Sequence, residues 1–184
     1  MAGDDWQAAG KLLLNSEAEI VAGAANPWDG PDGESHWCVL RDLRALLGDG
    51  RAAIAEASAL TTVAALVQAY SERWWRLDQL HVGVRAACRQ ANGLEQVRRL
   101  TDLAYFDIVS KINARFCELI ETQPQWPPVG CADVASIRAA LWQPAGRSAV
   151  VIVDACRWDL AQSLRERLGE NCTLTPLLAT LPTE

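Results

Sequence analysis

The sequence contains no apolar run close to the roughly 20 residues that a membrane-spanning helix needs. Its first residues include Asp4 and Asp5 and lack the basic and apolar regions of a signal peptide. It has no Cys-x-x-Cys pair, and only two histidines accompany six irregularly spaced cysteines. These absences predict a cytoplasmic protein whose cysteines are small buried hydrophobes, without a disulfide framework or a structural zinc site.

An excess of basic residues is also missing. The formal net charge is -6 at neutral pH, which argues against a dedicated nucleic-acid scaffold because such a protein needs a basic surface. A catalytic site for phosphate groups is still compatible with this charge, since metal ions can supply the positive charge. Half of the 184 residues are hydrophobic, which is enough for a folded core.

What the sequence does contain is helical periodicity over most of its length. Helices are predicted over 5–23 and 37–47, with a loop at 24–35 between them and a stop at the "GDG" of 48–50, before a new helix near Arg51. Two longer helices, 61–91 and 94–122, are separated by Gly93 and predict an antiparallel hairpin. Their apolar stripes comprise Val63, Val67, Tyr70, Trp74, Leu77, His81, Val84 and Cys88, and then Val97, Leu100, Ala104, Ile108, Ile112, Phe116 and Leu119.

The pattern changes after a proline-rich stretch at 123–130. Asp133 is suited to cap a short helix that ends near Trp142, and "QPAGR" at 143–147 reads as a linker. The sequence therefore predicts a helical region over 1–145 and a different unit over 146–184. The protein is expected to be mainly α-helical, with the start of an α/β domain at its end.

The second unit begins with the run "SAVVIVDACRWD" at 148–159. Residues 149–153 are apolar on both faces, which is typical of a strand in a covered parallel sheet. A helix over 157–168 follows, with Leu160, Leu164 and Leu168 on one face, and a second short strand is expected within 172–184. This order predicts a β-α-β unit with a right-handed crossover. Two strands and one helix cannot close a core, so the chain is expected to be the N-terminal part of something larger.

Asp154 lies at the end of the first predicted strand. Ligands of open α/β sheets bind beyond the carboxyl ends of the strands, so this carboxylate has the position of a ligand-binding group. An Asp at this point also suits the first turn of the helix that follows, as a cap. Residue types alone leave both interpretations open.

The wider pattern resembles the PglZ family of the alkaline phosphatase superfamily. The stretch "VVIVDACRWDLAQSL", followed by "LLATLPTE", is similar to the start of the PglZ catalytic domain, in which a strand ending in Asp precedes a "D-A-x-R-[YW]-D" run, a helix, a second strand and an "LPTxTP" turn. The upstream stretch "YSERWWRLDQLHVGVRAA" at 70–87 resembles the helical region that precedes this domain in PglZ proteins of BREX-type phage-defence systems. The rest of the chain is compatible with the family but carries none of its motifs.

The resemblance implies metal-dependent phosphatase or phosphodiesterase chemistry. Asp154 would ligate one of two divalent metal ions, expected to be zinc, with magnesium or manganese as alternatives. The family nucleophile is most often the second Thr of "PTxT", which would fall one residue beyond Glu184, so Thr183 is the candidate within this chain. The partners implied are a phosphate-ester or phosphodiester substrate and other defence-system proteins. Without the later ligands, the fragment itself is expected to be inactive.

Several other residues leave two interpretations each. Arg157 either pairs with Asp159 or approaches a substrate phosphate, and His81 is either a hydrogen-bonded core residue or a metal ligand. Trp74 fits core packing better than nucleic-acid stacking. A basic face near the hairpin turn fits a solvated or protein-docking surface, or a nucleic-acid contact, and comprises Arg73, Arg76, Arg85, Arg89, Arg98 and Arg99. As a whole, the chain would alternatively be a non-catalytic helical protein-interaction module.

Overall fold

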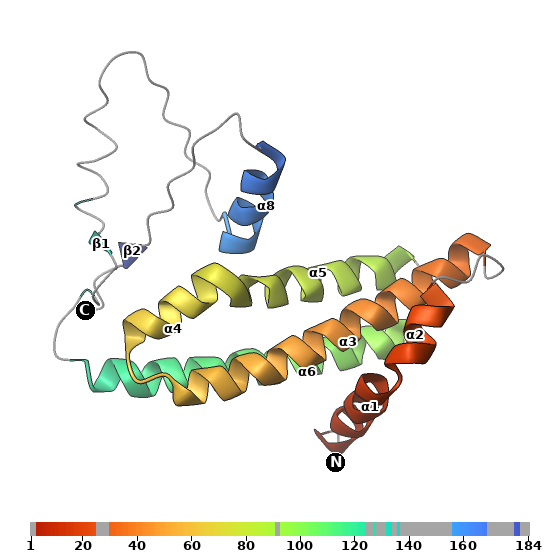
Figure 1. Ribbon diagram of the computed structural model, residues 1–184, viewed down its shortest axis with the longest axis horizontal. Coiled ribbons are helices and arrows are strands. Elements are labelled where there is room, and N and C mark those ends of the chain that lie inside the picture. Colours follow the sequence, from red (N-terminus) through yellow and green to blue (C-terminus); the bar gives the residue numbers. More distant parts are fainter. Residues whose placement is uncertain are drawn as a thin grey trace.

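A computed structural model of the chain describes residues 3–24, 30–90, 93–123, 127, 132–133, 136, 156–168 and 179–180. This part of the protein is mainly helical, as the sequence predicts, and long helices run side by side along the length of the molecule (Figure 1). Within it, no helix is both long and apolar enough to cross a membrane.

The N-terminal helix predicted over 5–23 is two helices, α1 (Gly3–Asn15) and α2 (Glu17–Ala24), which meet at Ser16. The sequence contains a local signal for this break that the prediction overlooked. Ser16 and Glu19 have the Ser-x-x-Glu spacing of a capping box, which favours the start of a new helix. The chain turns here, and both helices then pack against α3 (Gly30–Ala59).

Helix α3 corrects two predictions at once. It begins at Gly30, inside the predicted loop at 24–35, and it runs without interruption through the "GDG" of 48–50. Gly50, the second glycine of this stretch, serves packing instead of ending the helix. Gly50 is buried, and a Cβ atom at this position would clash with the Cδ1 atom of Ile108, so glycine allows α3 and α6 (Glu95–Glu121) to approach closely.

This close approach leads to a paired prediction. Gly50→Ala should destabilise the protein by about 1–2 kcal/mol, because the cost of overpacking against the stiff, buried Ile108 outweighs the helix propensity of alanine. Gly83→Ala should instead stabilise it by about 0.5–1 kcal/mol, since Gly83 is exposed in a helix and no atom lies within 4 Å of an added Cβ. Urea unfolding of both variants measures the change in the free energy of unfolding, which should be opposite in sign for the two. Equal changes would contradict the packing role of Gly50.

The predicted hairpin is present. Its first arm consists of α4 (Val63–Ala69), the π-helical turn η1 (Tyr70–Trp74) and α5 (Trp75–Gln90), and its second arm is α6. Gly93 has a φ of 80°, the left-handed conformation expected of a helix stop. The described residues of 61–120 contain no strand, and the predicted stripes face the core, with Trp74, Leu77, Val84 and Ile108 among its buried members.

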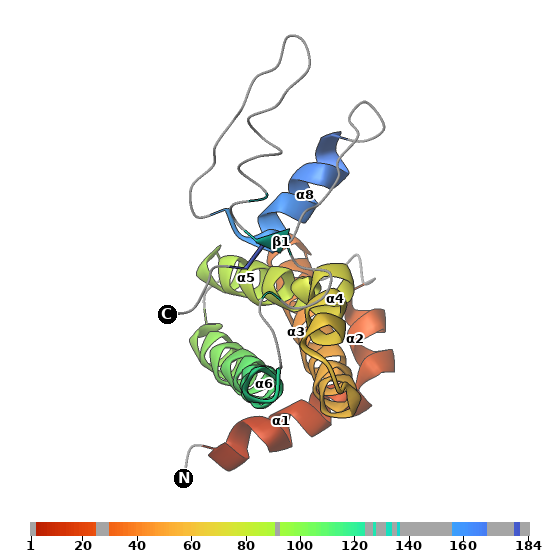
Figure 2. The same ribbon diagram turned by 90° about the vertical axis from the view of Figure 1, so that its left-hand side faces the viewer.

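The core lies between three helices. Figure 2, which views the molecule along the helices, shows α3 beside both arms of the hairpin, and α3 packs against α5 and α6 at least as extensively as these two pack against each other. Leucines of α3 such as Leu43, Leu46 and Leu47 fill the interior. The two arms of the hairpin and α3 therefore enclose one common core.

The predicted strand at 149–153 lies outside the described residues, so the full β-α-β unit is not shown. Its helix is present as α8 (Trp158–Leu168), and a two-residue strand, β2 (Ala179–Thr180), falls within the predicted second strand. Strand β2 pairs in parallel with β1 (Ala132–Asp133), with Asp133 opposite Thr180. Asp133 is thus a strand residue where a helix cap is predicted. Of the short helix expected there, Ser136 is helical and the other residues lie outside the described part.

Candidate functional site

The structure describes one of the three site residues predicted from the sequence. Asp154 and Thr183 lie outside the described residues, whereas Arg157 is placed directly before α8. Helix α8 begins at Trp158, only one residue later than predicted, and packs against α5 of the hairpin. The contacts at the base of α8 therefore define the candidate site.

Arg157 forms a bidentate ion pair with Asp159. Its Nε atom lies 3.0 Å from Oδ1 and its Nη2 atom lies 2.6 Å from Oδ2 of this carboxylate. The hydrogen bond to Asp159 raises the pKa of the Arg157 guanidinium. Asp159 is buried, at 2% exposure, whereas about half of the Arg157 side chain is exposed. The ion pair that the sequence allows is present, and it leaves the Nη1 atom of Arg157 for another acceptor.

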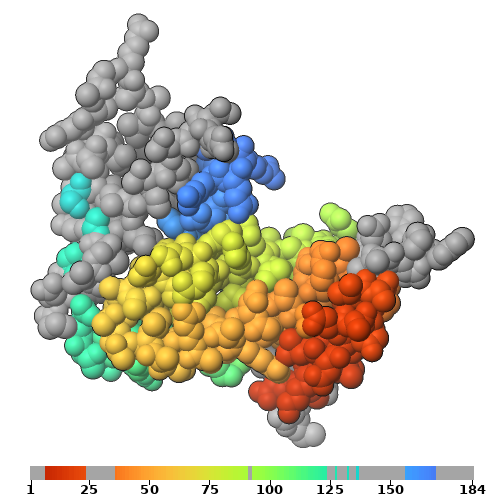
Figure 3. All heavy atoms as spheres, viewed as in Figure 1, coloured from red at the N-terminus to blue at the C-terminus, as the bar shows by residue number. Residues whose placement is uncertain are grey.

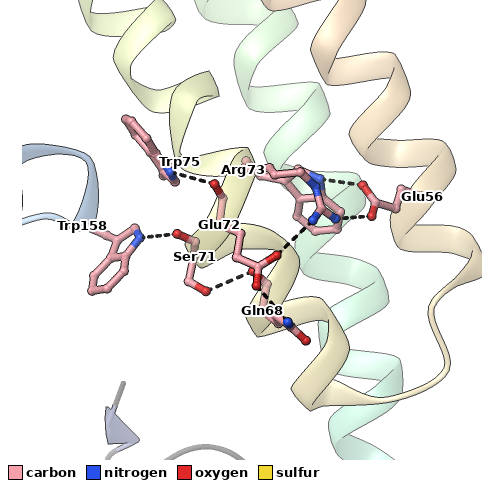
Figure 4. Close-up of polar contacts among 8 residues, drawn as sticks. Glu56, Gln68, Ser71, Glu72, Arg73, Trp75 and Trp158 are labelled. Atoms are coloured by element: carbon pink, nitrogen blue, oxygen red, sulfur yellow. Dashed lines mark hydrogen bonds and ion pairs between the residues drawn. The ribbon is translucent and has the colours of Figure 1, made fainter. Parts of the chain in front are cut away.

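Two further contacts hold α8 on the hairpin. The indole nitrogen of Trp158 donates a hydrogen bond to the backbone oxygen of Ser71, at 2.9 Å (Figure 4). The amide of Gln79 donates to the hydroxyl of Ser163 at 2.6 Å, and that hydroxyl donates to the backbone oxygen of Asp159. The polar side of α8 is thus the side that faces the hairpin. Its predicted apolar face is turned away from it, since Leu160, Leu164 and Leu168 are exposed.

The π-helical turn η1 provides the acceptor for Trp158. In this turn the backbone N–H of Trp75 reaches the oxygen of Tyr70, five residues earlier, so the usual hydrogen-bond register is shifted. The oxygens of Ser71 and Glu72 accept the indole N–H groups of Trp158 and Trp75 (Figure 4). Single π-turns inside helices are often found at functional sites. Helical periodicity alone does not reveal such a turn.

Next to this turn lies a carboxylate that the sequence reasoning did not single out. Asp78 accepts a hydrogen bond from the hydroxyl of Tyr70 and one from the hydroxyl of Tyr105, both at 2.7 Å. Burial, followed by the hydrogen bond to Asp78, raises the pKa of both tyrosines. Both phenols therefore stay protonated donors at neutral pH. In the sequence, only the position of Tyr70 on the apolar stripe pointed to this group of three side chains.

His81 is a buried, hydrogen-bonded histidine, as the simpler interpretation predicts. Its Nε2 atom lies 2.8 Å from the Oδ1 atom of Asp102, and its ring stacks on Tyr105 with a centroid distance of 3.9 Å and an interplanar angle of 3°. Arg85 and Arg98 also lie within 4 Å of Asp102. The contacts of His81 thus explain its place in the core without a metal ion.

A cavity of about 310 Å³ separates the base of α8 from the hairpin. Three aromatic side chains, two charged side chains, one histidine and one valine line it: Tyr70, Asp78, His81, Val82, Tyr105, Arg157 and Trp158. The bulk of α8 lies directly against the hairpin in the space-filling view (Figure 3). Arg157, the one described residue with a predicted role at the site, therefore shares a cavity with residues that sequence reasoning missed.

The basic face predicted near the hairpin turn is partly neutralised. Arg73 pairs with Glu56 and Glu72, and Arg98 pairs with Glu95. Arg76 lies over the ring of Trp75, 5.5 Å from its centroid. Trp74 is buried and donates to Glu56, so the predicted packing role is confirmed. Ion pairs of this kind reduce the field that a nucleic-acid backbone would meet.

Of the four cysteines among the described residues, one is buried as predicted, and the predicted burial of Cys131 and Cys172 lies outside these residues. Cys88 is buried, and burial raises the pKa of its thiol, but Cys117 and Cys156 are exposed and Cys38 is half-buried. All four are free thiols. In the described ranges, no group of three or more His, Cys, Asp and Glu side chains is arranged to hold a metal ion.

No protein-family model, no curated protein and no solved structure matches this chain. Its function is therefore inferred from the motif and from the contacts at the base of α8.

Proposed function

We propose that this chain is the N-terminal part of a PglZ-type, metal-dependent phosphatase or phosphodiesterase of a bacterial phage-defence system of the BREX type. The proposal rests on the resemblance of "VVIVDACRWDLAQSL" and "LLATLPTE" to the start of the PglZ domain. In it, residues 146–184 begin an alkaline-phosphatase-like α/β domain. Helix α8 is consistent with such a start. The described partner of β2 is β1, which precedes residue 146.

One observation carries the proposal beyond the motif. The three consecutive residues of its "RWD" segment all act in fixing the start of α8: Arg157 pairs with the buried Asp159, and Trp158 binds the carbonyl of Ser71. Asp154 precedes this anchored segment by three residues. A metal ligand must be held within a fraction of an ångström to act, and the helical region supplies a rigid support for that purpose.

The described residues do not themselves complete a metal site. They contain no cluster of three or more suitable side chains, and Asp154 alone would be a single ligand. In the proposed enzyme the metal ions, zinc or alternatively magnesium or manganese, would stabilise the attacking and leaving oxygens of the phosphoryl group.

This chain's own residues have defined roles in the proposal. Asp154 is the metal ligand and Thr183 the candidate nucleophile. Arg157 would reach a substrate phosphate through Nη1, since Asp159 occupies its other two donor atoms. The Arg157–Asp159 pair would also hold the guanidinium in one orientation, which favours recognition of a phosphate oxygen. In this proposal the protein acts in the cytoplasm on a phosphate ester or phosphodiester, with other defence proteins, or nucleic acid, as partners.

A second function is favoured by a different observation. Leu160, Leu164 and Leu168 form an exposed apolar face on α8, with the first two at 52% and 51% exposure. Such a face is typical of a helix that is covered by another protein surface. In this alternative, the chain is a non-catalytic helical interaction module, and Asp154 only caps α8.

Comparing two forms of the protein tests the catalytic proposal. The 184-residue chain should hydrolyse no bis-para-nitrophenyl phosphate and bind no divalent metal tightly, because one carboxylate supplies too few ligands. The longest natural protein that contains this chain should do both, and a chelator should abolish its activity. Chelator-sensitive hydrolysis by the 184-residue chain would overturn the assignment and make Thr183 the leading nucleophile. Absence of metal and activity from the long form would favour the interaction module.

A further inference from the structure

We propose that the cavity between the hairpin and α8 binds a small alkylammonium cation. The proposal concerns the aromatic cavity, which is lined by Tyr70, Asp78, Tyr105 and Trp158 together with His81, Val82 and Arg157. It does not rest on the proposed phosphoester chemistry, although both proposals involve Arg157. The cavity volume of about 310 Å³ is at the lower end of the range of ligand pockets, which suits a small head group and not a large molecule.

The charge of the aromatic cavity favours a cation. In the described part of the chain, Asp102 is close to His81 and two arginines, and Asp159 pairs with Arg157. Asp78 takes part in no such ion pair there and accepts only two neutral hydroxyl groups. Arg157 also lines the cavity and interacts electrostatically with Asp78, but Asp159 pairs with it directly, so these three side chains together carry one net negative charge. This net negative charge favours a small cation inside the cavity.

The aromatic walls select the kind of cation. Tyr70, Tyr105 and Trp158 surround the space, and aromatic ring faces attract cations electrostatically. Each oxygen of Asp78 already accepts one hydroxyl hydrogen bond, so a ligand that needs several hydrogen-bond acceptors is served poorly. A quaternary ammonium group, in which all four substituents are carbon, carries its charge without N–H donors. Aromatic recognition of quaternary ammonium groups rests on this property.

The rings are held in place before any ligand arrives. The hydroxyls of Tyr70 and Tyr105 are bound to Asp78, the indole of Trp158 is bound to Ser71, and His81 stacks flat on Tyr105. Binding would therefore cost little ordering of side chains, which is the main benefit of a preorganised site. A ligand here would contact both the hairpin and α8, so it would also strengthen the docking of α8.

The test is an NMR titration of the 184-residue chain with choline and with its neutral isostere, 3,3-dimethyl-1-butanol. Choline should saturate a shift of the Trp158 indole N–H resonance, which Trp158→Phe identifies by its loss. The isostere should bind at least about 10-fold more weakly, since it keeps the shape and loses the charge. Equal binding of the two probes, or no shift of Trp158 with choline, would overturn the proposal.

Three variants locate the interaction. Asp78→Asn keeps the shape and an acceptor but removes the charge, and should weaken choline binding at least about 10-fold. Tyr105→Phe keeps the ring and should change the affinity less than about 3-fold. The control Asp107→Asn removes a carboxylate of the same helix that pairs with Lys111 away from the cavity, and should leave binding unchanged. If Asp78→Asn folds and binds choline as tightly as the parent does, the assignment to this cavity is wrong.

Discussion

Asp154→Asn in the longest natural protein that contains this chain should reduce phosphoester hydrolysis by about 100-fold and leave the melting temperature of the metal-free protein unchanged. Asparagine is as good a helix cap as aspartate, so a capping role would be preserved. It lacks the negative charge that a divalent metal ligand needs. Activity and bound metal should therefore fall together while the fold is unaffected. Initial rates, metal content and thermal unfolding of the purified variant measure the three quantities.

The matched variants of this experiment separate the two roles of Asp154. Asp154→Ala removes both the cap and the ligand, so it should cost about 0.5–2 kcal/mol of stability in addition to the activity if the carboxylate caps α8. Asp49→Asn, an exposed position on α3, controls for the loss of one negative charge. A fully active Asp154→Asn enzyme would end the metal-ligand interpretation, and a variant that loses stability as well as activity would point to a structural role.

The long helices could be predicted from the sequence because their stripes are regular and local. The stripe from Val63 to Cys88 repeats every three or four residues, and Gly93 marks its end with a conformation that other residues rarely adopt. Such signals need no knowledge of distant partners. The same holds for α8, which is predicted to within one residue from its own pattern.

Features that depend on distant partners could not be predicted. The Gly-Asp-Gly stretch that contains Gly50 is typical of a turn. Only the proximity of Ile108 explains why a glycine is needed here within a helix. The hairpin brings α6 beside α5, and this places Asp78 between Tyr70 and Tyr105. No local spacing in the sequence predicts that Asp78 accepts hydrogen bonds from both tyrosines. The same is true of the bond from Trp158 to Ser71, which spans 87 residues of sequence.

The orientation of α8 illustrates a limit of amphipathic patterns. Leu160, Leu164 and Leu168 form an apolar face, and the simplest expectation is that this face packs on the rest of the described chain. In the structure it is the polar side that docks, through Asp159, Gln162 and Ser163. A periodic pattern identifies an apolar face without identifying what covers it. Both proposed functions require that this exposed apolar face be covered. In the catalytic proposal a β-sheet would cover it, and in the alternative a partner protein would.

Trp74→Ala should reduce the free energy of unfolding by about 3–5 kcal/mol, the largest effect expected for a single core substitution here. Trp74 is 5% exposed, and it packs in the core that α3 shares with the hairpin, at the end of the π-turn that receives Trp158. Its indole also donates to Glu56, which keeps Arg73 as a partner, so the loss reflects mainly the cavity left behind. Trp74→Phe keeps most of the packing and should cost less than half as much. Urea unfolding measures both values, and a loss below about 1 kcal/mol for Trp74→Ala would mean that this ring does not support the core.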